Sequence, residues 1–241
     1  MDQVFDRVSG VDAALVWDPS VSGTAAITTA LFGLLRPGDQ MVSLTGRPYD
    51  TLHAVLGLGE KGSGSLQDFG VEYRELDLLP DGRVDREGIP TAVAGAKIAY
   101  LQRSRGYATR PSLTVAEIGE IAALVKTASP ATLVVVDNCY GELVERLEPT
   151  QVGADLIMGS LIKNPGGGIA RTGGYIAGRK DLVEPCAHRL TAPGMGREGG
   201  CSLGEKKHRE RGLLFAQTGV AAGLEEEVFG VRAVAWWGVS G

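Results

Sequence analysis

Two hydrophobic patterns alternate along the chain. Residues 23–39, GTAAITTALFGLLRPGD, carry apolar side chains at helical spacing until a Pro-Gly pair ends the pattern. Residues 132–136, TLVVV, form the continuous apolar run that is typical of a strand buried on both sides. The same patterns predict further helices at 48–57 and 114–128, and further strands at 40–44, 71–76, 97–102, 155–160 and 173–178.

This alternation predicts an α/β fold. Strands that are separated by helices of such length are joined by right-handed crossovers, so we expect a mostly parallel sheet with helices on both faces. Ligands of such sheets bind beyond the carboxyl ends of the strands. Chemistry is therefore expected where the strands end.

Composition narrows the class of protein. The 241 residues suit one α/β domain with a sizeable core, with 44% hydrophobic and 22% charged residues. The formal net charge is -5, and acidic and basic residues are interspersed along the chain. This pattern favours neither nucleic acid nor a membrane as partner. The opening MDQVFDRVSG lacks the pattern of a signal peptide, so we expect a cytoplasmic protein.

Cysteine and histidine add little chemistry. Cys139, Cys186 and Cys201 lack metal-ligand spacing, and we expect buried thiols. The three histidines are too scattered to form a close ligand pair, so no metal site is expected; they are His53, His188 and His208.

The first polar feature is the turn Ser22 to Thr24, which opens the helix predicted at 23–39. The start of a helix offers unpaired N–H groups and a positive dipole end, so this turn can bind a phosphate. An ordinary N-cap by Ser22 explains the same residues.

The second feature is Asp137, directly after the apolar strand 132–136. A carboxylate in this position is desolvated and stays ionised only beside a cation or several donors. A protonated ring nitrogen would be such a partner. An Asp that caps the following turn is an equally good interpretation.

The third feature is Lys163 in GSLIKNPGGG, three residues after Ser160. A lysine amine attacks carbonyl groups only when deprotonated, and we expect a partly desolvated cleft with other cations nearby to lower its pKa. Ser160 and the glycines can approach a phosphate closely. A lysine before Pro-Gly-Gly is alternatively a loop charge. The order of phosphate turn, Asp and Ser-x-x-Lys along one α/β chain is a sharper signal than any part.

Five segments carry a family resemblance: SGTAAITTALFGLLRPGD, TGRPYDTL, VVVDNCYGELVE, VGADLIMGSLIKNPGGGIARTGGYIAG and RLTAPGMG. They resemble the aluminium-resistance or methionine γ-lyase-like branch of the fold-type I pyridoxal-phosphate enzymes. The resemblance implies the large domain of a fold-type I PLP-dependent transferase, with pyridoxal 5'-phosphate (PLP) as cofactor.

Site roles follow from this resemblance. It makes Lys163 the Schiff-base lysine of an internal aldimine and Asp137 the partner of the pyridinium nitrogen. Tyr49 matches the aromatic residue that stacks on the pyridine ring, and its phenol is a candidate proton donor to a leaving group; a tyrosine that merely packs at a helix start is the alternative. Arg105 corresponds to a polar contact with cofactor or substrate, although the local motif differs. The positions that contact the phosphate are Ser22, Gly23, Thr24 and Ser160.

The implied activity is a carbon-sulfur lyase that acts on a small sulfur amino acid by β- or γ-elimination, although the sequence does not choose between lyase, racemase and transferase outcomes. Full-length relatives of this branch are expected to be homodimers or homotetramers. We expect residues 1–199 to be a partial PLP-binding large domain and 200–241 a divergent C-terminal tail. Relatives carry an additional N-terminal segment and a C-terminal small domain, both of which we take to be missing here, so a truncated fragment with impaired activity is expected.

Two other functions fit parts of the sequence. Ser160 and Lys163 have the spacing of a Ser-x-x-Lys acyl-transfer site, although the accompanying Ser-Asp-Asn and Lys-Thr-Gly motifs are absent. A non-catalytic remnant of the PLP fold, which binds the cofactor without turnover, is the other alternative.

Overall fold

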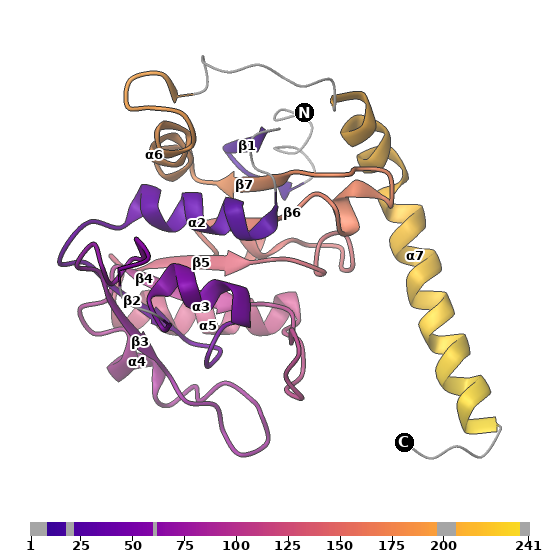
Figure 1. Ribbon diagram of the computed structural model, residues 1–241. Helices are drawn as coiled ribbons and strands as arrows, with labels where there is room; N and C mark the ends of the chain where they lie inside the picture. Colours follow the sequence, from indigo (N-terminus) through magenta and orange to yellow (C-terminus); the bar gives the residue numbers. More distant parts are fainter. Residues whose placement is uncertain (1–8, 18–21, 60–61, 197–205, 237–241) are drawn as a thin grey trace.

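The structure is a computed structural model, and it describes residues 9–17, 22–59, 62–196 and 206–236. A central sheet lies between helices, and one long helix extends away from this body (Figure 1). The described part of the chain holds no helix that is long and apolar enough to cross a membrane.

The sheet has seven strands in the order β1-β7-β6-β5-β4-β2-β3. Strands β2 to β6 pair in parallel, whereas β7 is antiparallel to both of its neighbours. The prediction of a mostly parallel sheet is confirmed. The strands are β1 Ala13–Trp17, β2 Gln40–Ser43, β3 Glu72–Glu75, β4 Ile98–Gln102, β5 Leu133–Asp137, β6 Leu156–Ser160 and β7 Gly174–Gly178.

Helices cover both faces, as predicted (Figure 1). The helix α2 begins at the N-cap Ser22, and a capping box of Thr114 and Glu117 begins α5. The helices are α2 Gly23–Leu34, α3 Asp50–Leu56, α4 Ile89–Ala92, α5 Val115–Ala128, α6 Lys180–Leu190 and α7 Lys206–Trp236, with short 3-10 turns η1 Pro149–Val152 and η2 Asn164–Gly166.

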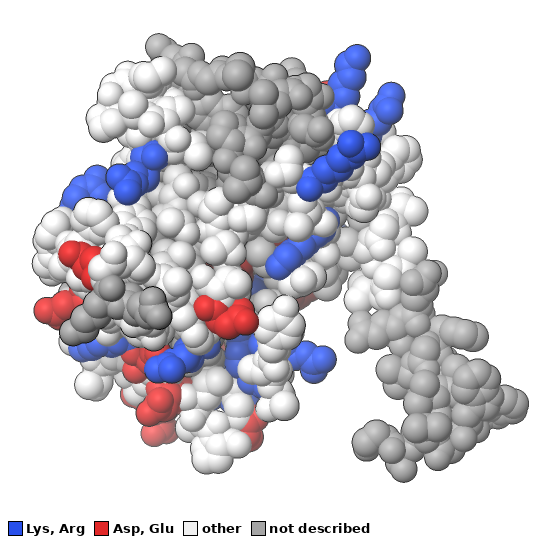
Figure 2. Space-filling view, viewed as in Figure 1, with Lys and Arg blue, Asp and Glu red and all other residues white. Residues whose placement is uncertain are grey.

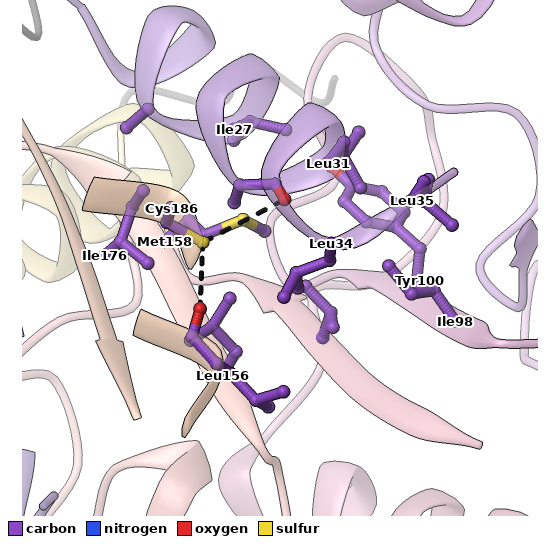
Figure 3. Close-up of a cluster of buried hydrophobic side chains, with 14 of the residues drawn as sticks. Ile27, Leu31, Leu34, Leu35, Ile98, Tyr100, Leu156, Met158, Ile176 and Cys186 are labelled. Atoms are coloured by element: carbon purple, nitrogen blue, oxygen red, sulfur yellow. Dashed lines mark hydrogen bonds between the residues drawn. The ribbon is translucent and has the colours of Figure 1, made fainter. Parts of the chain in front are cut away.

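The two-sided core follows from the alternation of side chains along each strand. Val134 and Val136 of β5 pack in the cluster that contains Ile118 of α5. Val135 faces the opposite way and packs in the cluster of α2 and α6. Figure 3 shows this second cluster, where side chains of α2, β6 and α6 meet.

Four of the described α-helices and strands were not predicted: β1, α4, α6 and α7. The helix α6 contains Pro185, which a sequence pattern treats as a helix breaker. Helix α4 has only four residues, so it shows no helical period of its own.

Glycines after Lys163 allow α7 to approach the body. A Cβ atom on Gly212 of α7 would overlap the carbonyl oxygen of Gly166. Gly167 has a φ of 54°, in the left-handed region that favours glycine. The proline-glycine run therefore forms a tight turn, η2, on which the first part of α7 packs.

Cys139 and Cys186 are buried thiols, as predicted, and Cys201 lies outside the described residues. Lys and Arg side chains share the face shown in Figure 2 with Asp and Glu side chains, so this face is not the uniformly basic surface that nucleic acid prefers.

Candidate active site

A cavity of about 490 Å³ opens at the carboxyl ends of β4, β5 and β6, beside the start of α2. The structure brings all eight predicted site residues to its wall: Ser22, Gly23, Thr24, Tyr49, Arg105, Asp137, Ser160 and Lys163. The expectation that ligands bind beyond the carboxyl ends of the strands (the strand-end rule) thus located the cavity correctly. The individual roles of these residues stay predictions.

The start of α2 forms one end of the cavity. The Ser22 hydroxyl accepts a hydrogen bond from the Ala25 N–H group at 3.1 Å, so Ser22 is an N-cap as well as a wall residue. A Cβ atom on Gly23 would lie 2.9 Å from the Ser160 Cβ atom and 3.4 Å from the Cys139 sulfur. Only glycine lets the helix start approach the end of β6 so closely.

Tyr49 and Thr24 join α3 to α2 across the cavity. Their hydroxyl groups lie 3.0 Å apart at hydrogen-bond distance, and the Tyr49 N–H group donates to Gln102 Oε1 at 2.9 Å. Burial raises the pKa of Tyr49, so its phenol is protonated at neutral pH. It can donate a proton, as the candidate role requires.

Asp137 is a buried carboxylate held by two donors. The Cys139 N–H group donates to Oδ1 at 3.1 Å, and the Tyr100 hydroxyl donates to Oδ2 at 3.4 Å. The bond to Cys139 is the turn-capping contact, so that interpretation of Asp137 is also correct. Burial raises its pKa, while those bonds and the charge of Lys163 act in the opposite direction.

Lys163 differs from the sequence prediction in its electrostatics. Its Nζ atom lies 3.8 Å from the centroid of the Tyr140 ring. Burial lowers its pKa, as expected. Cys139, Tyr140 and Asp137 raise it by more, so the predicted lowering of the pKa is wrong. The structure places a carboxylate and an aromatic ring beside the amine, where nearby cations were expected.

Arg105 lies on the loop after β4 and is exposed at the cavity wall. Within the described structure its guanidinium forms no hydrogen bond or ion pair. It is therefore available to an anionic group in the cavity, although its exposure weakens any such interaction.

Sequence analysis missed Gln102, Tyr100 and Tyr140. Gln102 lies at the end of β4, where its side chain accepts from Tyr49 N–H and donates to the Ser104 carbonyl oxygen. The strand-end rule applies to it as well, so this residue could have been found. Tyr100 and Tyr140 act through tertiary contacts that no sequence period reveals.

The acyl-transfer geometry is not formed. The Ser160 hydroxyl accepts from the Ile162 N–H group at 3.4 Å, and among the described contacts it has no bond to Lys163 Nζ. A lysine that activates a serine must lie within hydrogen-bond reach of it. The Lys163 amine rests on Tyr140 instead.

Comparisons with known proteins agree with the fold and identify the family. The methionine gamma-lyase family matches residues 1–240. YnbB of Bacillus subtilis, an uncharacterized protein, is 46% identical over 234 residues, which is 96% of this chain and 56% of YnbB. L-methionine gamma-lyase of Pseudomonas putida is 31% identical over 168 residues, 68% of this chain and 36% of that enzyme.

A solved structure from Listeria monocytogenes, of a candidate cystathionine beta-lyase involved in aluminum resistance, superposes with a TM-score of 0.97 at 47% identity. The superposition covers 99% of this chain and 59% of the Listeria chain. The fold is that of the fold-type I class of PLP-dependent enzymes. The chain belongs to the methionine gamma-lyase family and spans a little over half the length of YnbB and of the Listeria protein.

The cavity fits the cofactor that this family implies. Its volume lies in the range of small-molecule sites. Hydroxyl groups and the start of α2 offer donors to a phosphate, and Asp137 has no ion pair among the described residues. A buried carboxylate that has no ion pair favours a protonated nitrogen as its partner.

Proposed function

We propose that this chain binds PLP in the cavity and acts in carbon-sulfur bond elimination from sulfur amino acids. The observation that carries the proposal is the placement of Lys163 and Asp137 on one cavity wall, beside the phosphate-type donors of α2. When bound, PLP supplies an electrophilic carbonyl carbon and a ring that accepts electrons.

Each residue has a role that follows from its position in the cavity. Asp137 holds a proton-bearing ring nitrogen, because its buried carboxylate then gains a cationic partner. Gly23, Thr24 and Ser160 receive the phosphate, with Ser22 beside them. Tyr49 packs on the ring and donates its phenolic proton to the departing sulfur.

Lys163 would hold the cofactor through its amine, and the same amine would take the α-proton of the substrate. Both roles require the neutral amine, whereas the structure favours the ammonium form. A cation paired with Asp137 would compensate one of the charges that raise the pKa of Lys163. A cationic partner of Asp137 would therefore shift the Lys163 amine toward its neutral form. Elimination from the β or the γ carbon is compatible with this arrangement.

Turnover assays test the proposal. The purified chain with PLP should release a 2-oxo acid, ammonia and the sulfur leaving group (a thiol, or hydrogen sulfide from L-cysteine) from at least one of L-cystathionine, L-methionine and L-cysteine, more slowly than a full-length relative does. A Lys163→Arg variant keeps the positive charge and should lose this release. Bound PLP without release from any substrate would favour the non-catalytic alternative, and equal release by the variant would contradict the role of Lys163.

A further inference from the structure

Tyr140 has an unusual backbone and an unusual neighbour. Its φ of 68° lies in the left-handed region, which is strained for a non-glycine residue. Its side chain is 59% exposed and lines the cavity, with Lys163 Nζ 3.8 Å from the ring centroid. Strained residues persist only where the surroundings hold them.

Hydrogen bonds from Arg103 hold the turn that carries Tyr140. This buried guanidinium donates to Asn138 Oδ1 at 2.8 Å and to the Gly141 carbonyl oxygen at 2.7 Å. A Cβ atom on Gly141 would overlap the Arg103 side chain. The turn from 138 to 141 therefore has little freedom to shift.

Asn164 holds the same turn from the lysine side. Its Nδ2 atom donates to the Tyr140 and Glu142 carbonyl oxygens, both at 3.0 Å. Asn164 directly follows Lys163 in the chain. The backbone that carries the amine and the backbone that carries the ring are thus fixed to each other.

We infer that the Tyr140 ring is the resting site of the Lys163 ammonium group, which makes Tyr140 a positioning residue. The inference rests on the proposed function, in which the amine takes the α-proton of the substrate. In that step the C–H bond breaks, its electron pair stays with the substrate, and a new N–H bond converts the amine to an ammonium. The face of an aromatic ring attracts such a cation.

Other groups also face the amine and must be separated from the ring in a test. Asp137 at the end of β5 and Cys139 in the following turn both favour the charged lysine. Arg105, from the loop after β4, lines the same cavity. The Tyr140 hydroxyl also acts on the amine. Tyr140→Leu removes the ring and this hydroxyl but leaves the other groups in place, and Tyr140→Phe removes the hydroxyl alone.

Competitive labelling with acetic anhydride measures the charge of Lys163 directly. The chain, without PLP, is labelled between pH 7 and 11, and the extent of labelling at Lys163 is read by peptide mass spectrometry. The variants are Tyr140→Leu, which removes the ring, and Tyr140→Phe, which keeps it. Tyr107→Leu is the matched control, because Tyr107 lines the same cavity and is 94% exposed.

We expect the half-labelling pH of Lys163 to fall by about 0.4–0.7 in Tyr140→Leu, which corresponds to a cation–π energy of about 0.5–1 kcal/mol. Tyr107→Leu should match the wild type, and Tyr140→Phe, which loses only the hydroxyl, should fall by less than Tyr140→Leu. An unchanged Tyr140→Leu, or an equal fall in Tyr140→Phe or Tyr107→Leu, would overturn the inference. Because no cofactor is present, the result does not depend on whether the chain is a lyase.

Discussion

Gly23 at the start of α2 lies against Ser160 at the end of β6, and a Cβ atom on Gly23 would come within 2.9 Å of the Ser160 Cβ atom. This contact brings the donors of the helix start to the end of the strand that precedes Lys163. Gly23 therefore allows α2 to pack against β6 so that both elements contribute to the cavity wall.

Gly23→Ala should displace the start of α2 and reduce the affinity for PLP. The steric conflict is with a short side chain and backbone, so we expect a loss of stability of about 1–3 kcal/mol. Chemical denaturation and a PLP titration measure both effects. Gly59→Ala is the control, because a Cβ atom there meets nothing within 4 Å. Wild-type stability and PLP affinity in Gly23→Ala would show that the contact is unimportant.

Asp137→Asn should have opposite effects with and without PLP. Burial raises the pKa of Asp137, so its ionised form destabilises the chain at neutral pH, and an isosteric amide should leave the Tm unchanged or higher. With PLP the wild type gains a charged partner that the amide cannot match. We therefore expect a smaller PLP-induced rise in Tm for the variant. An equal rise in both proteins would argue against an ion pair with the ring nitrogen.

Glu142 should make stability depend on pH. Burial raises its pKa to about 8, and Tyr175 donates to its Oε1 atom at 2.9 Å. Because the folded chain keeps this proton while the unfolded chain loses it near pH 4.5, the contribution to stability falls as the pH rises from about 4.5 to 8. The loss is up to about 5 kcal/mol.

Glu142→Gln isolates this effect, since the amide keeps an acceptor for Tyr175 and cannot ionise. Denaturation of both proteins at pH 5.5, 7 and 8 should show a flatter profile for the variant. Glu148 and Asp137, whose pKa values burial also raises, leave part of the dependence in place. Parallel profiles would mean that Glu142 does not titrate in this range.

Much of the fold could be predicted because the sheet is buried on both faces. The apolar run that ends at Asp137 has no other stable place in an α/β domain, and the end of that strand then locates the cavity. Helix α6 was not predicted because it contains Pro185. A sequence rule treats a proline as the end of a helix, whereas this helix tolerates it.

The electrostatics of the site could not be predicted in the same way. Cys139, Tyr140 and Asp137 together raise the pKa of Lys163, and the Tyr140 ring reaches the amine through a left-handed turn held by Arg103 and Asn164. No local pattern encodes these contacts, since they join residues from three different segments of the chain.

Covalent trapping tests the central claim most directly. The chain is incubated with PLP, reduced with borohydride and digested, and the pyridoxyl group is located by peptide mass spectrometry. We predict that it lies on Lys163, whose amine lines the cavity. Lys97 and Lys126 are the internal controls, because they form ion pairs with Asp39 and Asp155 away from the cavity. A pyridoxyl group on Lys97, Lys126 or Lys180 with none on Lys163 would contradict the account.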